Sequence, residues 1–501
     1  MGQLIKFANI NQRENASIKE KTIIECKAKF DEIFSYVLDT NAREAHKVEA
    51  SIFKKLLELG FHLLNLYFMN QNRGDYGKTV ETQKGIAIRG RLSMKSYFSI
   101  FGKLEILRYL YNCGDESFAI LDEIINLPTR CYSYFLSEFT SLLDLRGAYK
   151  ECCQFLERFF GLNLSVAAAE TIAKDSSQEY KTFYDDKNKQ ATDEQKEDFV
   201  VVSFDGKGVP MIKKEAAKIK GRPVKGEKRQ KKKEALVGVK YDINTNVRTA
   251  EEVANNLVYP ENKEDTLKPQ RKKAQNIRYI ASIEQPKREV MEEIKQSLEK
   301  KDFSKNPLIC VMDGARSLWK VFQEVFKEIE NKVFILDIIH VLEYIWLIAH
   351  VKYKEGSLDA SKYVYEKLLE ILNGNIASYI MELQEEIQNC VWKKSQKATF
   401  KKVITYLKNN RAYMHYDQYL SKGYPIGTGV VESACNHVVK ERMELSGARW
   451  GINGAEAILR LRSVVKSNDW DAYWEFYTSQ KYTENFSIKR LGYNVQFKVI
   501  A

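Results

Sequence analysis

The sequence predicts an α/β protein, with a domain built on a mixed five-stranded sheet, a helical insertion within that domain, and a mainly α-helical region before it. Three observations predict this class. Apolar residues recur at spacings of three and four within the first 70 residues, which is typical of amphipathic helices. After residue 198, short apolar runs alternate with helical stretches, the pattern of a partly parallel sheet. A later segment rich in Tyr, Lys and Glu carries no strand signal.

The N-terminal region, residues 1–92, is expected to contain two helices between residues 12 and 70. From Ser96 to Tyr111 the apolar period changes to two around Phe101-Gly102-Lys103. This change predicts two short strands joined by a tight turn.

Residues 93–184 are assigned as a region containing this hairpin and a helix-turn-helix-like DNA-binding element. Within 147–180, Gly161 interrupts a helical pattern and Ser165 is placed to cap a second helix. The pair fits a helix-turn-helix, but an ordinary helical hairpin gives the same pattern and is the commoner structure.

Residues 185–198 contain one apolar residue and are interpreted as a linker between domains. The sheet domain is assigned to residues 199–337 and 421–469. Three early strands are expected, the third in the run NVRTAEEV, followed by alternating helices and strands. The other predicted strands are FVVVSFD ending at Asp205, EALVGVKYDIN from Glu234, NPLICVMD ending at Asp313 and NKVFILD ending at Asp337. Residues 338–420 form the helical insertion, and 470–501 are left unassigned as a C-terminal tail.

Positive charge is concentrated in one segment. The chain has a formal charge of +12, and residues 213–233 hold eleven basic residues against Glu215 and Glu227, a local net charge of +9. Such a segment attracts polyanions and favours a grip on the phosphate backbone of DNA, although a solvated charged loop is the alternative. The basic residues are Lys213, Lys214, Lys218, Lys220, Arg222, Lys225, Lys228, Arg229, Lys231, Lys232 and Lys233.

Eight cysteines are scattered without a CxxC pair, so neither a zinc site nor a disulfide framework is expected. The sequence shows no signal peptide and no run of 18 apolar residues, so no membrane partner is expected and the predicted location is the cytoplasm.

Two aspartates stand where predicted strands end, and each is followed by glycine. Asp205 and Asp313 follow apolar runs, and the ends of central strands open into the crevice that usually binds ligands in α/β sheets. The alternatives are a hairpin turn for Asp205 and a helix cap for Asp313. Two carboxylates in one crevice would suit divalent cations, which bind oxygen ligands.

A third acid is needed for chemistry with two metal ions, and Glu432 is the candidate. It lies on the predicted helix after the insertion, with Asn436, Lys440 and Glu444 at steps of four on about the same face. The alternative is an exposed helical glutamate, which is the usual position of this residue type.

Five ordered segments then show a resemblance. These segments lie between residues 204 and 450, about half of the chain. They are FDGKGVPM, KKKEALVGVKY, VMDGARSLW, LDIIHVLEYIW and GYPIGTGVVESACNHVVKERMELSGARW. They resemble bacterial insertion-sequence transposases of the DDE class, closest to the ISKra group. Members of that group often carry paired cysteines before an LDE segment, whereas only Cys113 stands near Leu121-Asp122-Glu123 here.

The resemblance implies a ribonuclease-H-like catalytic domain with Asp205, Asp313 and Glu432 as catalytic and metal-binding triad. It further implies two Mg²⁺ or Mn²⁺ ions, double-stranded DNA partners (terminal inverted repeats and target DNA), a homodimer or larger assembly on DNA, and a nucleoid-associated location. Asp337 and His340 resemble the D-x-x-H element of related transposases, although a helix-start Asp and a packed His explain them equally well.

The function expected from the resemblance is DNA transposition, in which the enzyme binds the ends of an insertion sequence, cleaves phosphodiester bonds and joins 3′ ends to target DNA. A nuclease or resolvase without strand transfer, and a non-catalytic DNA-binding descendant, are the alternatives. Arg449 and Trp450 follow the Glu432 helix and would be able to stack on an unpaired base, although a core position is the commoner one for such a Trp.

Overall fold

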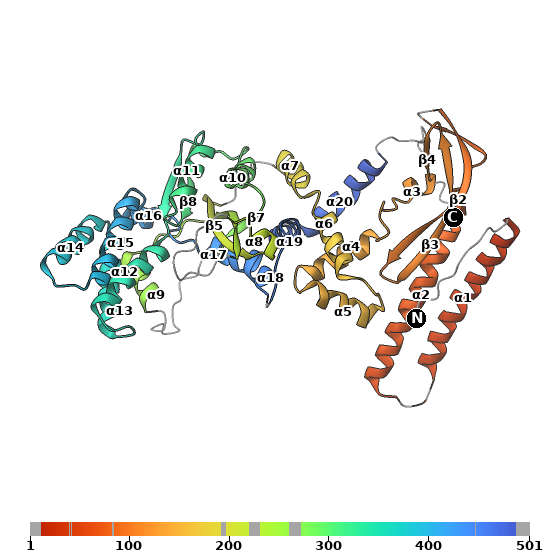
Figure 1. Cartoon of the computed structure of the whole chain (residues 1–501), viewed down its shortest axis with the longest axis horizontal. Coiled ribbons are helices and arrows are strands. Elements are labelled where there is room, and N and C mark those ends of the chain that lie inside the picture. Colours follow the sequence, from red (N-terminus) through yellow and green to blue (C-terminus); the bar gives the residue numbers. More distant parts are fainter. Residues whose placement is uncertain are drawn as a thin grey trace. The chain divides into compact units, whose positions relative to one another are not determined.

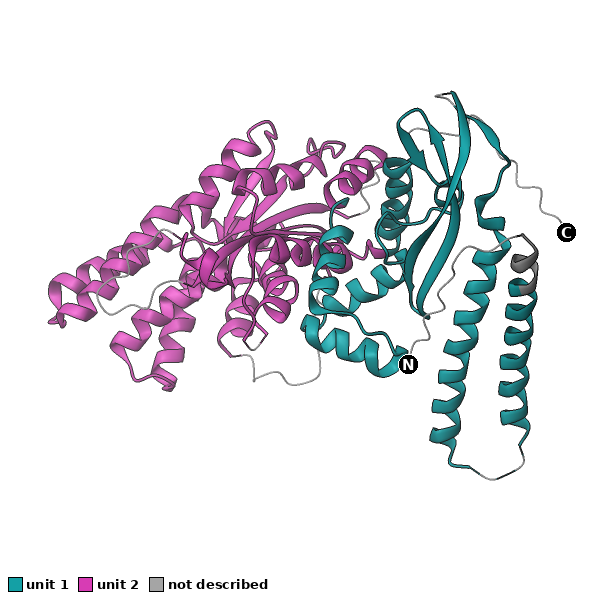
Figure 2. Ribbon diagram, turned by 45° about the vertical axis from the view of Figure 1, so that its right-hand side comes forward, with its two compact units in different colours: residues 1–179, 471–501 teal, residues 180–470 magenta. Residues whose placement is uncertain are grey.

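The structure is a computed structural model, which describes residues 12–39, 41, 43–82, 85–191, 197–219, 231–259, 272–445 and 447–486. The chain divides into two compact units, coloured separately in Figure 2: residues 1–179 with 471–501 form unit 1, and residues 180–470 form unit 2. The predicted C-terminal tail therefore belongs to the same unit as the N-terminal region. In the described part of the chain, no helix combines the length and apolarity needed to cross a membrane.

Unit 1 begins with a long helical hairpin, as predicted, and continues with a sheet and short helices (Figure 1). Its helices are α1 (Gln12–Leu38), α2 (Ala45–Asn70), η1 (Asn72–Gly74), α3 (Ile120–Ile124), α4 (Tyr134–Asp144), α5 (Tyr149–Phe160), α6 (Val166–Ser176) and α20 (Trp470–Asn485), the last of which starts at the boundary between the units.

The predicted hairpin of unit 1 is present, but its strands are longer than expected. A four-stranded antiparallel sheet has the order β1-β2-β3-β4, with β1 (Thr79–Thr82), β2 (Gly85–Ser99), β3 (Gly102–Cys113) and β4 (Glu116–Phe118). Ser99 pairs with Gly102 across a two-residue turn, and Gly102 has the positive φ of 134° that glycine adopts without a steric penalty. The predicted alternation of apolar residues began at Ser96, so the prediction missed residues 85–95 of β2.

The helix pair predicted within 147–180 forms with the expected break at Gly161, although its second helix ends at Ser176. Helix α5 ends at Gly161, whose φ is 67°, and Ser165 caps α6 by accepting a hydrogen bond from the Ala168 N–H at 3.1 Å. Both helices pack with α4. The C-terminal helix α20 joins this unit through Tyr473, whose hydroxyl donates to the Ser176 carbonyl, and through an ion pair of Lys481 with Glu179.

Unit 2 contains the predicted mixed five-stranded sheet, in the order β7-β6-β5-β8-β9. Strands β5, β6 and β7 are antiparallel neighbours, whereas β8 and β9 run parallel to β5. The β-branched run of β5 favours a central strand, since both of its faces are buried. The strands are β5 (Phe199–Pro210), β6 (Lys232–Ile243), β7 (Gln275–Ser282), β8 (Leu308–Met312) and β9 (Lys332–Leu336).

The prediction for the third early strand was wrong. The run NVRTAEEV contains the start of helix α9 (Ala250–Val258), and the strand is β7, later in the chain. Thr249 and Glu252 form a capping box, each side chain accepting from the other residue's backbone N–H. The S/T-x-x-E signature of such a box was present in the sequence. The predicted linker is also partly helical, because α7 (Tyr180–Gln190) extends into it.

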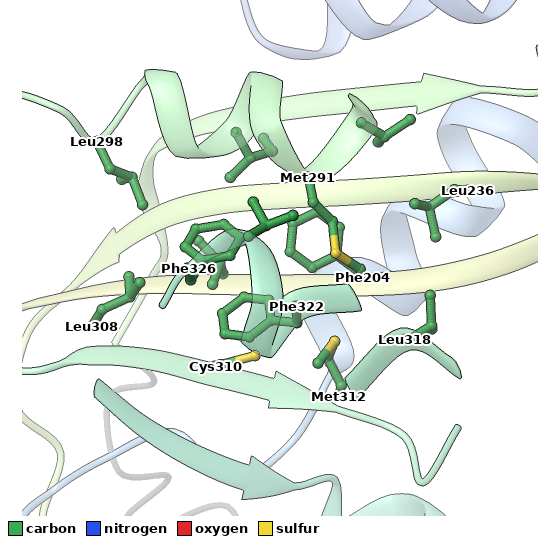
Figure 3. Packing of buried hydrophobic residues seen from close by; sticks show 14 of the residues in the cluster. Phe204, Leu236, Met291, Leu298, Leu308, Cys310, Met312, Leu318, Phe322 and Phe326 are labelled. Carbon is green, nitrogen blue, oxygen red and sulfur yellow. The ribbon is translucent and has the colours of Figure 1, made fainter. Parts of the chain in front are cut away.

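Helices cover both faces of the sheet in unit 2. Helices α10 (Lys287–Gln296) and α11 (Arg316–Val325) pack on one face, where Phe204, Met291 and Phe322 join an apolar core (Figure 3). The opposite face is covered by α17 (Gly429–Ala434), the π-helical segment η3 (Cys435–Lys440) and α19 (Ile452–Lys466). Side chains alternate along a strand, so Asp205 points to the face opposite that of Phe204.

The predicted insertion consists of helices joined by turns and loops, and it covers one edge of the sheet. The Tyr416 hydroxyl donates to the Leu336 carbonyl at 2.8 Å, and Tyr419 donates to Phe334 at 3.0 Å, which satisfies carbonyl groups of edge strand β9. Its helices are α12 (Ile338–Lys352), α13 (Leu358–Leu372), α14 (Ile376–Asn389), α15 (Lys394–Asn410), η2 (Arg411–Tyr413) and α16 (Tyr416–Ser421); α8 (Lys213–Ala216) and α18 (Glu441–Met443) complete unit 2.

Candidate metal centre

Asp205 lies within strand β5 and not at its end. The strand continues to Pro210 in its ladder with β6, but its pairing with β8 stops at Val202. Asp205 therefore stands three residues beyond the last parallel pair between β5 and β8. Its Oδ1 accepts from the Gly206 N–H at 2.7 Å. The prediction of a strand-end carboxylate was therefore correct for the β8 side only.

Asp313 directly follows the buried strand β8, as predicted, and its Oδ1 accepts from the Ala315 N–H at 3.0 Å before helix α11. The capping interpretation thus applies as well. Gly314 leaves room for the insertion, since a Cβ there would lie 2.5 Å from Cε2 of Tyr406 and 2.9 Å from Nδ2 of Asn410. The missing side chain of Gly314 therefore leaves space for side chains of helix α15.

Asp337 follows strand β9 and caps helix α12 by accepting from the Ile339 N–H at 3.1 Å. The carboxylate is fully buried. Its Oδ2 lies 2.7 Å from Nδ1 of His340, one turn along α12. The interpretation of Asp337 as a helix-start residue is confirmed, whereas the D-x-x-H interpretation stays a prediction.

Glu432 lies on α17 and is connected to Asp337 through Thr428. The Thr428 N–H donates to Asp337 Oδ1 at 3.1 Å, and its hydroxyl oxygen lies 2.7 Å from Asp337 Oδ2 and 3.0 Å from Glu432 Oε1. A hydroxyl has one proton to donate. Only one of the two carboxylates can receive it at a time, which leaves the other with spare acceptor capacity for a cation.

Cys435 connects Asp205 to the same helix. Its thiol donates to Asp205 Oδ2 at 3.3 Å. Burial raises the pKa of this thiol well above its ordinary value, and the negative charges of Asp205 and Glu432 raise it further. The sulfur therefore stays protonated and acts as a donor beside the carboxylates.

Among the described residues, one set of three side chains offers ligand atoms that all lie within 4.8 Å of one another: Asp337, His340 and Glu432. The predicted triad is therefore not the most compact group, although Asp205 and Asp313 belong to the same electrostatic environment. Burial raises the pKa of Asp313, and the charges of Asp205 and Asp337 add to that increase, while the Ala315 N–H and His340 oppose it.

Four carboxylates with one histidine are a donor set that suits a hard divalent cation. Like charges in a partly buried site repel, and a bound cation would relieve that repulsion. Hydrogen bonding to Asp337 raises the pKa of His340 to about 9, with support from the charges of Asp337 and Asp313, so this imidazole carries a positive charge at neutral pH. His340 thus partly balances the acids, and it must lose a proton before it can bind a metal.

The accessory role of the residues at steps of four after Glu432 stays a prediction. Asn436 and Lys440 are exposed and lie on the π-helical segment η3. Glu444 instead forms an ion pair with Lys232 at 2.5 Å.

The basic segment is described in part. Lys220, Arg222, Lys225, Lys228 and Arg229 lie outside the described residues. Lys213 and Lys214, on α8, and Lys231 are exposed, and Lys233 is half-buried. Lys218 is paired with Glu215 at 2.9 Å.

Trp450 is a core residue, so the suggestion that it stacks on a base is wrong. Its side chain is buried, its Nε1 donates to the Met443 carbonyl at 3.0 Å, and its backbone N–H donates to Pro210 at the end of β5. The guanidinium of Arg442 lies 4.7 Å from the centre of its ring. Arg449 is exposed, so it remains accessible to a ligand.

Three residues near the site were not predicted. Thr428 and Cys435 bind the carboxylates directly, while Tyr406 stacks on Tyr344 with ring centres 3.8 Å apart. Burial raises the pKa of Tyr406, and the charges of Asp313 and Asp337 contribute. Thr428 stands before the helix in the segment GTGVVES, where a Thr N-cap would have been a recognisable signal. No family model matches this sequence, and no curated protein matches it.

Proposed function

We propose that this chain is a metal-dependent DNA transposase with a ribonuclease-H-like catalytic domain, in which Asp205, Asp313 and Glu432 hold two Mg²⁺ or Mn²⁺ ions. The observation that carries the proposal is the convergence of acids from distant parts of the sequence. Cys435 joins Asp205 to the Glu432 helix, and Asp313 interacts with Asp205 electrostatically. Such convergence beside the parallel strands β5 and β8 favours a site over separate helix caps.

The sheet order supports the same proposal. Three antiparallel strands are followed by two parallel ones, and the first acid lies on the central strand β5 and the second directly after its neighbour β8. The third acid comes from a helix that follows the insertion and covers the sheet face to which Asp205 points. In this arrangement, an intact sheet would be needed to bring residues 205, 313 and 432 together.

The chain's own residues would position the metal ligands and the DNA. Asp337 lies within hydrogen-bond distance of the Thr428 N–H, the Thr428 hydroxyl and Nδ1 of His340. It would therefore orient Thr428 and His340 next to Glu432. Bound divalent ions supply activation of an attacking oxygen and stabilisation of the leaving oxygen in phosphodiester chemistry. Exposed Lys213, Lys214 and Lys231 would contact phosphates without reading the base sequence.

Recognition of the element's ends is assigned to the helix pair α5 and α6. Ala167 is exposed on the first turn of α6, the part of a recognition helix that contacts base edges. An Ala167→Glu variant should bind end sequences less selectively over random duplex. Unchanged selectivity in a binding competition assay would favour the ordinary helical hairpin.

The test is a cleavage and joining assay with labelled duplexes that carry the sequences flanking the gene. Wild-type protein should nick them with Mg²⁺ or Mn²⁺ and join the 3′ ends to a target plasmid. Asp205→Asn and Asp313→Asn should each lose at least about a hundredfold in nicking rate, since each removes a charged oxygen ligand. Asp115→Asn, in an exposed turn of unit 1, is the matched control.

Two outcomes would change the proposal. An Asp205→Asn protein that nicks at the wild-type rate would refute the metal-site assignment. Nicking without any joined product would identify a nuclease or resolvase, because a simple nuclease does not join ends.

A further inference from the structure

The helical hairpin α1–α2 has a polar seam between its two helices. Lys29 pairs with Glu58 at 2.9 Å, Lys55 pairs with Glu32, and His62 lies 3.8 Å from Glu25. Exposed ion pairs contribute at most about 1 kcal/mol each. Among the described side chains of the two helices, only Thr22, Cys26 and Phe68 are buried. The hairpin therefore has little hydrophobic core of its own.

Large apolar side chains instead lie on the outside of this hairpin. Phe30, Phe34 and Val37 follow one another at spacings of four and three on α1, so they form one stripe. Leu56, Leu63 and Tyr67 form a second stripe on α2, at spacings of seven and four. The six side chains are between 46% and 58% exposed.

The two stripes lie on the same side of the hairpin. With 3.6 residues per turn, each stripe is displaced from the ion-paired seam by about a third of a turn, in the same rotational sense. Because the helices run antiparallel, equal displacements bring both stripes to one side. Phe61 and Phe68 are displaced in the opposite sense and pack with Leu104 and Tyr97 of the sheet. The hairpin thus has a sheet-facing side and an uncovered apolar side.

We propose that this apolar face, formed by Phe30, Phe34, Val37, Leu56, Leu63 and Tyr67, binds the same face of a second copy of the chain and makes a four-helix dimer without DNA. Half of a large apolar side chain is about 100 Å², so six of them expose about 600 Å². Half-buried Ile23 continues the α1 stripe, and half-buried Ile52 and Leu59 lie between the α2 stripe and the seam; they bring the face close to the ~800 Å² per partner of a stable interface.

A second copy fits this face better than another partner does. An antiparallel helix pair that is apolar on one side is the building unit of an up-down four-helix bundle. Pairing through a twofold axis places the same patch on both subunits, so a face of this kind is complementary to itself. Figures 1 and 2 show the hairpin extending beyond the edge of the unit 1 sheet, which leaves its length accessible within that unit.

The test is the mass of the full-length protein in solution, measured by light scattering or sedimentation over a concentration series, without DNA or added metal. The wild type should be a dimer at micromolar concentration. A Phe34→Glu/Leu63→Glu variant should dissociate at least tenfold more readily, because each charge would be buried against an apolar partner. Ile24→Glu is the matched control, since Ile24 is 66% exposed on α1 but lies off the stripe.

A monomeric wild type, a charged variant with wild-type mass, or an Ile24→Glu protein that dissociates equally would each overturn the proposal. Circular dichroism must show unchanged helix content in the variants. If the glutamates unfold the hairpin, the proposal is tested instead by amide exchange of the wild-type protein in residues 27–38 and 56–67. The exchange rate there should fall as the protein concentration rises through the dimer range. An exchange rate that does not depend on concentration would overturn the proposal. Because neither measurement involves DNA cleavage, its failure is distinct from failure of the proposed catalysis.

Discussion

Thr428 binds both carboxylate oxygens of Asp337, through its backbone N–H at 3.1 Å and its hydroxyl at 2.7 Å. The same hydroxyl lies 3.0 Å from Glu432, so one short side chain connects a fully buried acid to the expected third metal ligand. Mutation of residues that orient metal ligands in this way typically lowers metal affinity by about 10- to 100-fold.

A Thr428→Val variant should therefore need at least about tenfold more Mn²⁺ for half-maximal nicking, with a smaller loss at saturating metal. It should also lose about 1–3 kcal/mol of stability, because a buried carboxylate oxygen loses its donor. Thr428→Ser keeps the hydroxyl and should restore both properties. Calorimetric titration with Mn²⁺ provides a readout that does not depend on DNA cleavage. Equal Mn²⁺ affinity in the Val and Ser variants would contradict the positioning role.

The salt dependence of DNA binding tests the described part of the basic segment. Replacement of Lys213, Lys214 and Lys231 by glutamine should reduce the slope of log affinity against log salt by about 2 to 3, because each lost phosphate contact contributes about 0.9. Fluorescence anisotropy with a random duplex between 50 and 200 mM salt, roughly the range where this effect is large, would measure it. Lys354, Lys362 and Lys394, exposed on the insertion, provide a triple control with the same charge change. Equal slopes for the two triple variants would favour a merely solvated loop.

The sequence predicted the central strands well because burial on both faces leaves an unambiguous signal. The runs before Asp205 and Asp313 are apolar and rich in β-branched residues, and each is a central strand. Strand β7 was missed because its first half, Gln275–Arg278, is mostly polar. Such a strand can be stabilised by pairing with a longer neighbouring strand, which the local sequence pattern does not reveal. The capping box at Thr249 was the overlooked signal for helix α9.

The sequence suggested candidate acids but not how they are grouped in space. Predicted strand ends and a resemblance singled out Asp205, Asp313 and Glu432. The distance between residues along the chain does not indicate which side-chain atoms lie closest to one another in space. The compact group that includes Asp337 and His340 depends on the Thr428 bridge and on the turn after β9. The π-helical segment that carries Asn436 and Lys440 could not be recognised from α-helical spacing.

Packing at the centre of the sheet gives a stability prediction. Gly238 of β6 stands opposite Phe204, and a Cβ there would lie 2.7 Å from the Phe204 ring and 2.8 Å from Ile280. Gly238→Ala should lower the free energy of unfolding by about 1–3 kcal/mol through overpacking. Gly429→Ala, where a Cβ would meet nothing within 4 Å, should be neutral or slightly stabilising. Urea denaturation of both variants compares them directly, and equal stability would show that the sheet adjusts without cost.

Arg462 supports the helix that carries Glu432. Its buried guanidinium donates to the Val438 carbonyl at 2.7 Å and to the His437 carbonyl, and it pairs with Glu441 at 3.1 Å. These donors satisfy carbonyl groups of the π-helical segment η3. Its first residue, Cys435, contacts Asp205, and its last residue leads into helix α18.

An Arg462→Lys variant should therefore lose about 2–4 kcal/mol of stability, because one ammonium cannot replace a planar group that serves three acceptors. If the π-helical turn relaxes, the Cys435 thiol should also move away from Asp205 and react faster with a thiol-specific reagent. Arg449→Lys, at an exposed position, should change neither property. Denaturant unfolding together with the rate of Cys435 modification separates the two effects, and a destabilised variant whose Cys435 reactivity is unchanged would mean that Arg462 stabilises the fold without shaping the site.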